Sequence, residues 1–270
     1  MRRKGGFFAR EIWSYLFKTG RLMLPQLIAA AALTGADRLM ISHFYGVAEL
    51  AKYSVAFSLG FLLSIVSSGI SSALYPWINR KILHGKYDTV NEVIRKLFFL
   101  ASLLTLLFLT AVPEIFKILA PSEYRDALIA VYPVAISVPF SFLTGISANV
   151  ITYYEKTYFL SSTSLASTLV TLMLSLMLTL RYGYIAAAFI VPASAITNLM
   201  FVGFSARTVS KKRLFPIKDY LGAAVILLSL SIPIFLFAEL LLARALLALA
   251  LILIIIPKSS EYRWLVMEGI

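Results

Sequence analysis

Long apolar segments separated by short basic or turn-forming segments make up most of this 270-residue chain. Eight segments are apolar over most of their length, namely residues 19–42, 50–78, 94–119, 127–150, 158–180, 184–206, 217–238 and 240–256. A helix of about 20 apolar residues crosses the hydrocarbon core of a bilayer. The pattern therefore predicts eight membrane-spanning helices, with seven as the main alternative because the last two segments are almost continuous. A transmembrane β-barrel is not expected, because apolar and polar residues do not alternate along these segments.

The composition supports a membrane protein. Hydrophobic residues make up 60% of the chain, which is more apolar surface than a soluble domain of this length can bury. No linker between the apolar segments is long enough to separate soluble domains. We therefore expect an all-α, polytopic bundle over residues 19–256. Residues 1–18 are predicted to form a basic lead-in at the membrane surface, and residues 257–270 a short cytoplasmic tail.

The formal net charge of +12 is distributed in a way that excludes nucleic-acid binding. Lysine and arginine gather in alternate connecting segments, such as residues 79–96 and 208–216, and are scarce in the segments between. Cytoplasmic segments of membrane proteins carry such an excess of positive charge. We expect a multi-pass protein of the cell membrane with both termini in the cytoplasm, where the basic residues also contact anionic lipids. Residues 79–96 are predicted to lie along the cytoplasmic surface as the longest loop.

Residues that could perform chemistry are scarce. The chain has no cysteine, and its two histidines, His43 and His84, have no metal-ligand spacing. No nucleophile elbow, phosphate-binding loop or paired-aspartate motif is present. The sequence therefore predicts no enzyme activity, no catalytic residue, no metal site and no cofactor.

Polar side chains form stripes along several of the predicted helices. At about 100° per residue, one narrow arc of the second span holds Ser54, Ser58, Ser68, Ser72 and Asn79. Small hydroxylated residues allow helices to pack closely in a membrane, and this is the expected role of similar stripes in the fourth and fifth spans. The stripe in the second span is longer and has aromatic neighbours. Two interpretations of this stripe stay open: it packs against another helix, or it forms the wall of a hydrated cavity.

Two adjacent charges, Asp37 and Arg38, lie near the end of the first span, and Gln26 shares the helical face of Asp37. A charge at mid-membrane costs about 2.5–3.5 kcal/mol on insertion scales, so such residues usually face a cavity or a partner. Adjacent helical side chains point about 100° apart, so at least one of the two should contact another helix or a ligand. The alternative is an ion pair that fixes the helix end at the interface. Glu114 and Arg244 lie at span ends and are expected to be structural.

Three short motifs, in this order, resemble a known family. Residues 37–41 read DRLMI, residues 49–56 read ELAKYSVA, and residues 181–188 read RYGYIAAA. They resemble the polysaccharide-transporter branch, which includes O-antigen and capsule repeat-unit flippases, of the MATE-like multidrug/oligosaccharidyl-lipid/polysaccharide flippase superfamily. The resemblance is to the second half of these proteins, from about residue 22 to residue 207. Ala51 and Ala186 stand where the family pattern has glycine.

The resemblance implies one lobe of a flippase that moves an isoprenoid-pyrophosphate-linked oligosaccharide from the inner to the outer leaflet for the biosynthesis of surface polysaccharide, such as lipopolysaccharide. It also implies a partner, either an N-terminal lobe on another chain or a second copy of this chain. The substrate-binding residues would be those named above: Gln26, Asp37, Arg38, Ser54, Ser58, Ser68, Ser72 and Asn79. Two alternatives stay open, a cation-coupled drug exporter of the same superfamily and a non-transporting fragment or assembly subunit.

Overall fold

The computed structural model describes residues 10–212, 214, 216–238 and 240–261, and its regular structure over these residues is entirely helical. The helices are α1 (Arg10–Tyr45), α2 (Val47–Leu83), α3 (Tyr87–Leu119), the short 3-10 helix η1 (Ser122–Ala127), α4 (Leu128–Tyr153), α5 (Thr157–Ser210), α6 (Ile217–Leu236) and α7 (Leu241–Glu261). The ends of the predicted lead-in and tail, residues 1–9 and 262–270, lie outside the described residues.

The predicted all-α membrane bundle is confirmed. Five helical segments of the described chain are long and apolar enough to cross a membrane: Val47–Leu83, Tyr87–Leu119, Ser122–Tyr153, Thr157–Ser210 and Lys218–Leu236. Leu241–Ile255 is a shorter apolar helix. Helix α1 contains the first predicted span and begins well before it, so residues 10–18 of the predicted lead-in continue this helix.

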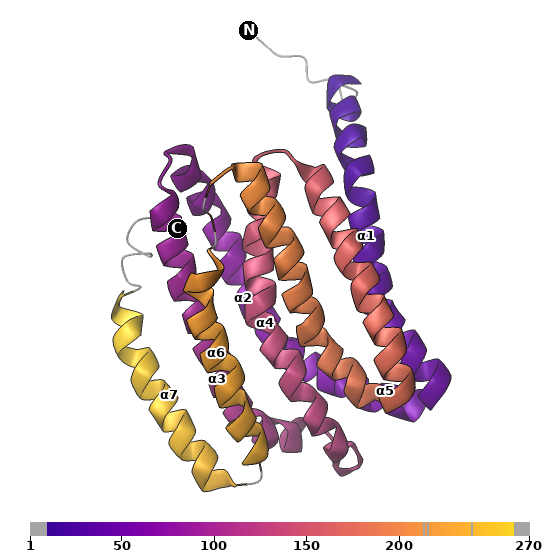
Figure 1. Ribbon diagram of the computed structural model, residues 1–270. Helices are drawn as coiled ribbons and strands as arrows, with labels where there is room; N and C mark the ends of the chain where they lie inside the picture. The colour runs from indigo at the N-terminus through magenta and orange to yellow at the C-terminus, as the bar shows by residue number, and fades with distance from the viewer. Residues whose placement is uncertain (1–9, 213, 215, 239, 262–270) are drawn as a thin grey trace, which may run out of the picture.

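Helix α5 contains two of the predicted spans because the chain reverses within it at Gly183. This glycine has φ 76° and ψ −162°, a conformation that is essentially confined to glycine. Figure 1 shows the two arms of α5 lying side by side and joined at the lower end of the bundle. Tyr45, the last residue of α1, closes this turn: its hydroxyl donates to the carbonyl oxygens of Thr179 at 2.9 Å and of Leu180 at 3.0 Å.

The predicted surface loop at residues 79–96 is wrong. Helix α2 continues to Leu83, and α3 begins at Tyr87, so only a short turn separates them. Gly85 provides that turn with φ 70°. The basic residues that suggested a surface segment instead lie on the last turns of α2 and the first turns of α3. Helices longer than the hydrocarbon core reach into the headgroup region, where such charges are solvated.

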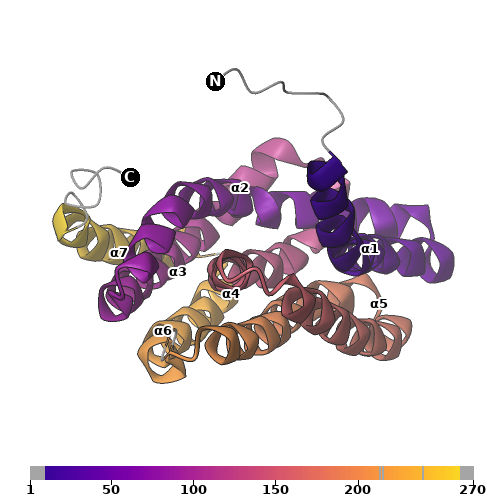
Figure 2. The same cartoon turned by 90° about the horizontal axis from the view of Figure 1, so that it is seen from above.

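Helix α4 lies at the centre of the bundle. Seen from above, it lies between one row of helices that contains α1, α2 and α3 and another formed by α5 and α6 (Figure 2). Helices α2 and α4 approach closely at Gly60, where an added Cβ would lie 2.8 Å from Cβ of Val134 and 2.9 Å from the carbonyl oxygen of Val131. A side chain does not fit there, and the two helices therefore pack backbone to backbone, as small residues allow in membranes.

The connections fall at two opposite ends of the bundle. The connections between α2 and α3, between α4 and α5 and between α5 and α6 lie at the upper end in Figure 1, and those between α1 and α2, between α3 and α4 and within α5 lie at the lower end. Below, these ends are called the upper and lower ends. Most lysines and arginines of the connecting segments lie at the upper end, as the charge pattern predicted.

Candidate functional site

A row of hydroxyl and aromatic side chains follows one face of α2 and is here called the α2 face. Its members are Ser54, Phe57, Ser58, Phe61, Ser68 and Ser72. All six are exposed or half-buried, so no helix of the described residues covers the whole face. Ser54 and Ser72 are 18 residues apart, which is about 27 Å along a helix and close to the thickness of a hydrocarbon core. The α2 face is therefore long enough to follow a path across most of a membrane.

The serines of the α2 face differ in their hydrogen bonding. Ser68 Oγ donates to the carbonyl oxygen of Ile65, and Ser72 Oγ donates to that of Ser68, both at 2.9 Å. Membrane helices often satisfy hydroxyl groups in this way. Ser54 and Ser58, in contrast, have no hydrogen-bond partner within the described part of the chain. Their hydroxyl groups are thus available to a ligand or to water.

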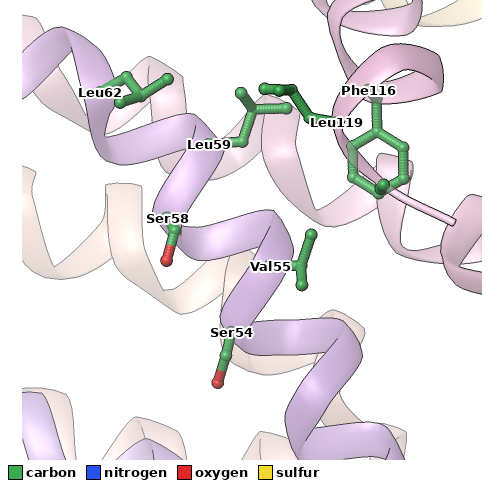
Figure 3. Close-up of a pocket in the computed structure, with 8 residues that line it drawn as sticks. Ser54, Val55, Ser58, Leu59, Leu62, Phe116 and Leu119 are labelled. Atoms are coloured by element: carbon green, nitrogen blue, oxygen red, sulfur yellow. The ribbon is translucent and has the colours of Figure 1, made fainter.

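A groove of about 420 Å³ runs between α2 and the end of α3 beside Ser54 and Ser58. It is lined mainly by apolar side chains, including Val55, Leu59 and Phe116. Figure 3 shows Val55 directed toward Phe116, whereas Ser54 and Ser58 point along a different side of α2. Ser54 and Ser58 also belong to the lining of this groove, so the groove and the α2 face adjoin at these two residues.

Aromatic rings and one guanidinium group join the lower part of the α2 face. The rings of Phe57 and Phe61 are stacked with centroids 5.4 Å apart. The exposed Arg38, near the end of α1, has its guanidinium carbon 5.8 Å from the centroid of Phe57. A cation near an aromatic face is attracted by the ring quadrupole, which here orients Arg38 toward α2. Arg38 makes no ion pair with a described residue, so its charge remains available.

Asp37 and Arg38 turn to different neighbours, as their spacing predicted. Asp37 Oδ1 accepts a hydrogen bond of 2.5 Å from Ser175 Oγ on the first arm of α5. Ser175 Oγ also lies 3.9 Å from Met40 Sδ and 3.5 Å from Thr179 Oγ1. Asp37 therefore contacts a second helix, and Arg38 contacts the α2 face. The interfacial ion pair between the two residues, considered above as an alternative, does not form.

Two further predicted site residues lie apart from this group. Asn79 is at the upper end of α2, where its Oδ1 accepts a hydrogen bond of 2.9 Å from Asn149 Nδ2 of α4. This contact is of the kind that holds membrane helices together. Gln26 lies in α1, but its side chain is outside the described residues.

The pairing of Glu114 with Arg244 could not be recognised in the sequence. Arg244 is only 3% exposed and donates from both terminal nitrogens to the carboxylate of Glu114, at 2.6 Å for Nη2. Its Nη1 also donates to the carbonyl oxygen of Thr110 at 3.0 Å. The ion pair joins α7 to α3 near the lower end of the bundle, away from the α2 face.

Comparison with known proteins identifies the family. The MatE family matches residues 25–177, more than half of the chain. No curated protein and no solved structure matches. The chain belongs to the MatE family, whose members are transporters and not enzymes. The protein is thus a membrane transporter of the MATE superfamily, and the matched residues include α1 from residue 25 onward, all of α2 and their polar groups.

Proposed function

We propose that this transporter acts on an isoprenoid-pyrophosphate-linked oligosaccharide and moves it from the inner to the outer leaflet during surface polysaccharide assembly. The observation that carries the proposal is the α2 face, with its serine hydroxyl groups, stacked rings and a free guanidinium group near one end. Hydroxyl groups and rings suit a sugar, which needs hydrogen bonds and apolar contact together. Arg38 offers a planar, permanently charged donor for phosphate oxygens. The proposal also assigns the chain to the polysaccharide branch of the superfamily, which the sequence motifs resemble.

A second lobe, on another chain or on a second copy of this one, is proposed to face the α2 face. Polar side chains in a membrane usually face the bundle interior or a water-filled cavity, because lipid cannot satisfy them. With a second lobe opposite, the α2 face would form one wall of a central path. Rocking of one lobe against the other would then open this path alternately to the two sides.

Single cysteine variants test the path. The chain has no native cysteine, so a thiol reagent labels only the introduced residue. We expect Ser58→Cys and Ser68→Cys in native membranes to react with a water-soluble thiol reagent, because the α2 face borders water. The matched control is Ser229→Cys, an exposed serine on α6 whose hydroxyl donates to the carbonyl oxygen of Ile226. It should react at least about tenfold more slowly, because a lipid-facing thiol is rarely ionised.

Substrate protection extends the same experiment to function. Added lipid-linked oligosaccharide should slow the labelling of Ser58→Cys, and a cationic drug should not. Equal labelling of Ser58→Cys and Ser229→Cys would contradict the proposed path. Protection by the drug alone would assign the path to drug export. Cross-linking from Ser68→Cys should yield a covalent product larger than one chain.

The proposed orientation places the upper end of the bundle in the cytoplasm of a cell-membrane protein, with both termini on that side. Positive charge is retained in the cytoplasm during insertion, and the upper end carries most of it. Topology reporters inserted after Gly85 and fused after Ile270 should both give a cytoplasmic signal. A reporter inserted at Ser122, at the lower end, should give an external signal. An external signal after Gly85 or Ile270 would overturn this orientation.

A further inference from the structure

A second group of cations lies at the upper end of the bundle, on helices α3, α5 and α6 and not on α2. It is formed where α3 begins, α5 ends and α6 begins, and its members are Arg95, Arg207, Lys212 and Lys218. The connection between α5 and α6 brings them together: Lys211 adopts a left-handed conformation with φ 52°, which ends α5 and turns the chain toward α6. This group is called the α3–α6 cluster.

Arg207 is held in place by the backbone of this connection. Its Nε donates to the carbonyl oxygen of the buried Leu214 at 3.0 Å. Its two terminal nitrogens have no hydrogen-bond partner among the described residues. A guanidinium group that is oriented through Nε presents both terminal nitrogens in one plane, which is the geometry that binds two oxygens of a phosphate.

Arg95 and Tyr220 complete the donors of the cluster. Arg95 and Arg207 are charged neighbours of the Tyr220 hydroxyl. The tyrosine is 7% exposed, its ring packs edge-on against Phe98 at 5.7 Å, and its hydroxyl is buried without a hydrogen-bond partner in the described structure. A buried hydroxyl without a partner is costly, so an acceptor that reached this hydroxyl would stabilise it. The hydroxyl would then donate beside the two arginines.

Acidic side chains do not neutralise the cluster. Asp219 is an exposed neighbour of Tyr220, and it makes no ion pair within the described residues. Glu92, one turn before Arg95 and Lys96, is paired with Lys96 at 2.7 Å. Lys212 lies over the ring of Tyr87, with its Nζ 5.6 Å from the centroid. The cluster therefore keeps an excess of positive charge around Arg95 and Arg207.

The surroundings of the cluster favour a lipid over a soluble ion. Below Lys218, an exposed apolar stripe follows the same side of α6 and consists of Leu221, Val225, Leu228 and Ile232. A headgroup that contacts the cluster would place its acyl chains along this stripe. We propose that the α3–α6 cluster is a binding site for the phosphate group of an anionic membrane lipid, with Arg95, Arg207 and Tyr220 as the donors. The site is distinct from the α2 face and does not depend on the substrate that is transported.

Lipid titration tests the site. Phosphatidylglycerol is added to the purified protein in detergent, and bound lipid is counted by native mass spectrometry. Arg95→Gln and Arg207→Gln should each weaken binding about fivefold, the effect of one basic residue near an anionic lipid surface. Tyr220→Phe, which removes only a hydroxyl, should weaken binding by a smaller factor. Arg181→Gln is the matched control, because Arg181 is an exposed arginine at the lower end of the bundle.

The outcomes separate the possible explanations. If Arg207→Gln does not fold, Arg95→Gln alone still tests the site. Arg95 makes no hydrogen bond to a described residue, so its replacement should leave the fold intact. Equal weakening by Arg181→Gln and Arg95→Gln would show attraction by net charge alone and overturn the proposal. In another outcome, equimolar inorganic phosphate displaces the lipid from the unmodified protein but binds neither the Arg95 nor the Arg207 variant. That result would support a phosphate site but assign it to a soluble ion instead of a lipid. Binding that is unchanged in all variants would also overturn the proposal.

Discussion

Glu114→Ala is expected to destabilise the fold by about 3–5 kcal/mol, the usual cost of leaving one member of a buried ion pair without its partner. The two partners are not equivalent, because Arg244 is buried whereas the side chain of Glu114 is 40% exposed. Without Glu114, the guanidinium group would remain buried with only the carbonyl oxygen of Thr110 as an acceptor. Without Arg244, the carboxylate of Glu114 could turn outward. Arg244→Met should therefore cost less than Glu114→Ala.

Thermal or denaturant unfolding in detergent, followed by circular dichroism, measures these differences. The double variant Glu114→Ala/Arg244→Met should be more stable than Glu114→Ala alone, because no charge is then left buried. Glu123→Ala is a suitable control, since Glu123 is exposed on η1 at the same end of the bundle. Additive losses in the double variant would show that the ion pair does not couple α3 to α7.

Arg38→Ala is expected to reduce transport of lipid-linked oligosaccharide by roughly tenfold or more, since a hydrogen bond to a charged group contributes about 1.5–3 kcal/mol. The amount of protein in the membrane should stay near that of the unmodified protein, because Arg38 is exposed and makes no ion pair or hydrogen bond with a described residue. Arg38→Lys should restore part of the activity, because lysine keeps the charge but lacks the planar fork. Flipping in vesicles that also contain any partner lobe measures the effect.

Arg181→Ala is a closely matched control for Arg38→Ala. Arg181 is also exposed at the lower end of the bundle, and its guanidinium carbon lies 5.6 Å from the ring centroid of Tyr182. It should retain full transport. Asp37→Asn tests the neighbouring charge while keeping an oxygen that can accept from Ser175. Depletion of the Arg38 and Asp37 variants, with full activity per remaining molecule, would make both residues structural.

The sequence predicted the parts of the fold that follow from local composition. The apolar blocks located the helices, and the break between segments 158–180 and 184–206 located the turn within α5, which lies at Gly183. The position of Asp37 near a span end predicted a contact with another helix, but Ser175 could not be named, because many hydroxyl groups on the fifth span were equally plausible. The choice depends on how α1 and α5 pack, which short-range patterns do not contain.

The main errors came from charged residues near helix ends. The basic residues at 79–96 suggested a surface loop, whereas both helices continue beyond the apolar core. Glu114 and Arg244 were expected to be structural, but nothing near them in sequence indicates that they pair with each other. Whether the predicted site residues contact substrate stays a prediction. The structure does distinguish Asn79, which is hydrogen-bonded to Asn149, from Ser54 and Ser58, which have no hydrogen-bond partner among the described residues.

The polar contacts between distant helices have a consequence for biosynthesis. Ser175 follows Asp37 by 138 residues, and Arg244 follows Glu114 by 130. At about 5–20 residues per second, a ribosome needs roughly 7–28 s to make such a stretch. During that interval the nascent chain would hold Asp37, and later Glu114, in or near the bilayer without its final partner. The early helices would then depend on the insertion machinery or an insertase until α5 and α7 emerge, and a ribosome stalled before α5 would expose Asp37 to membrane quality-control proteases.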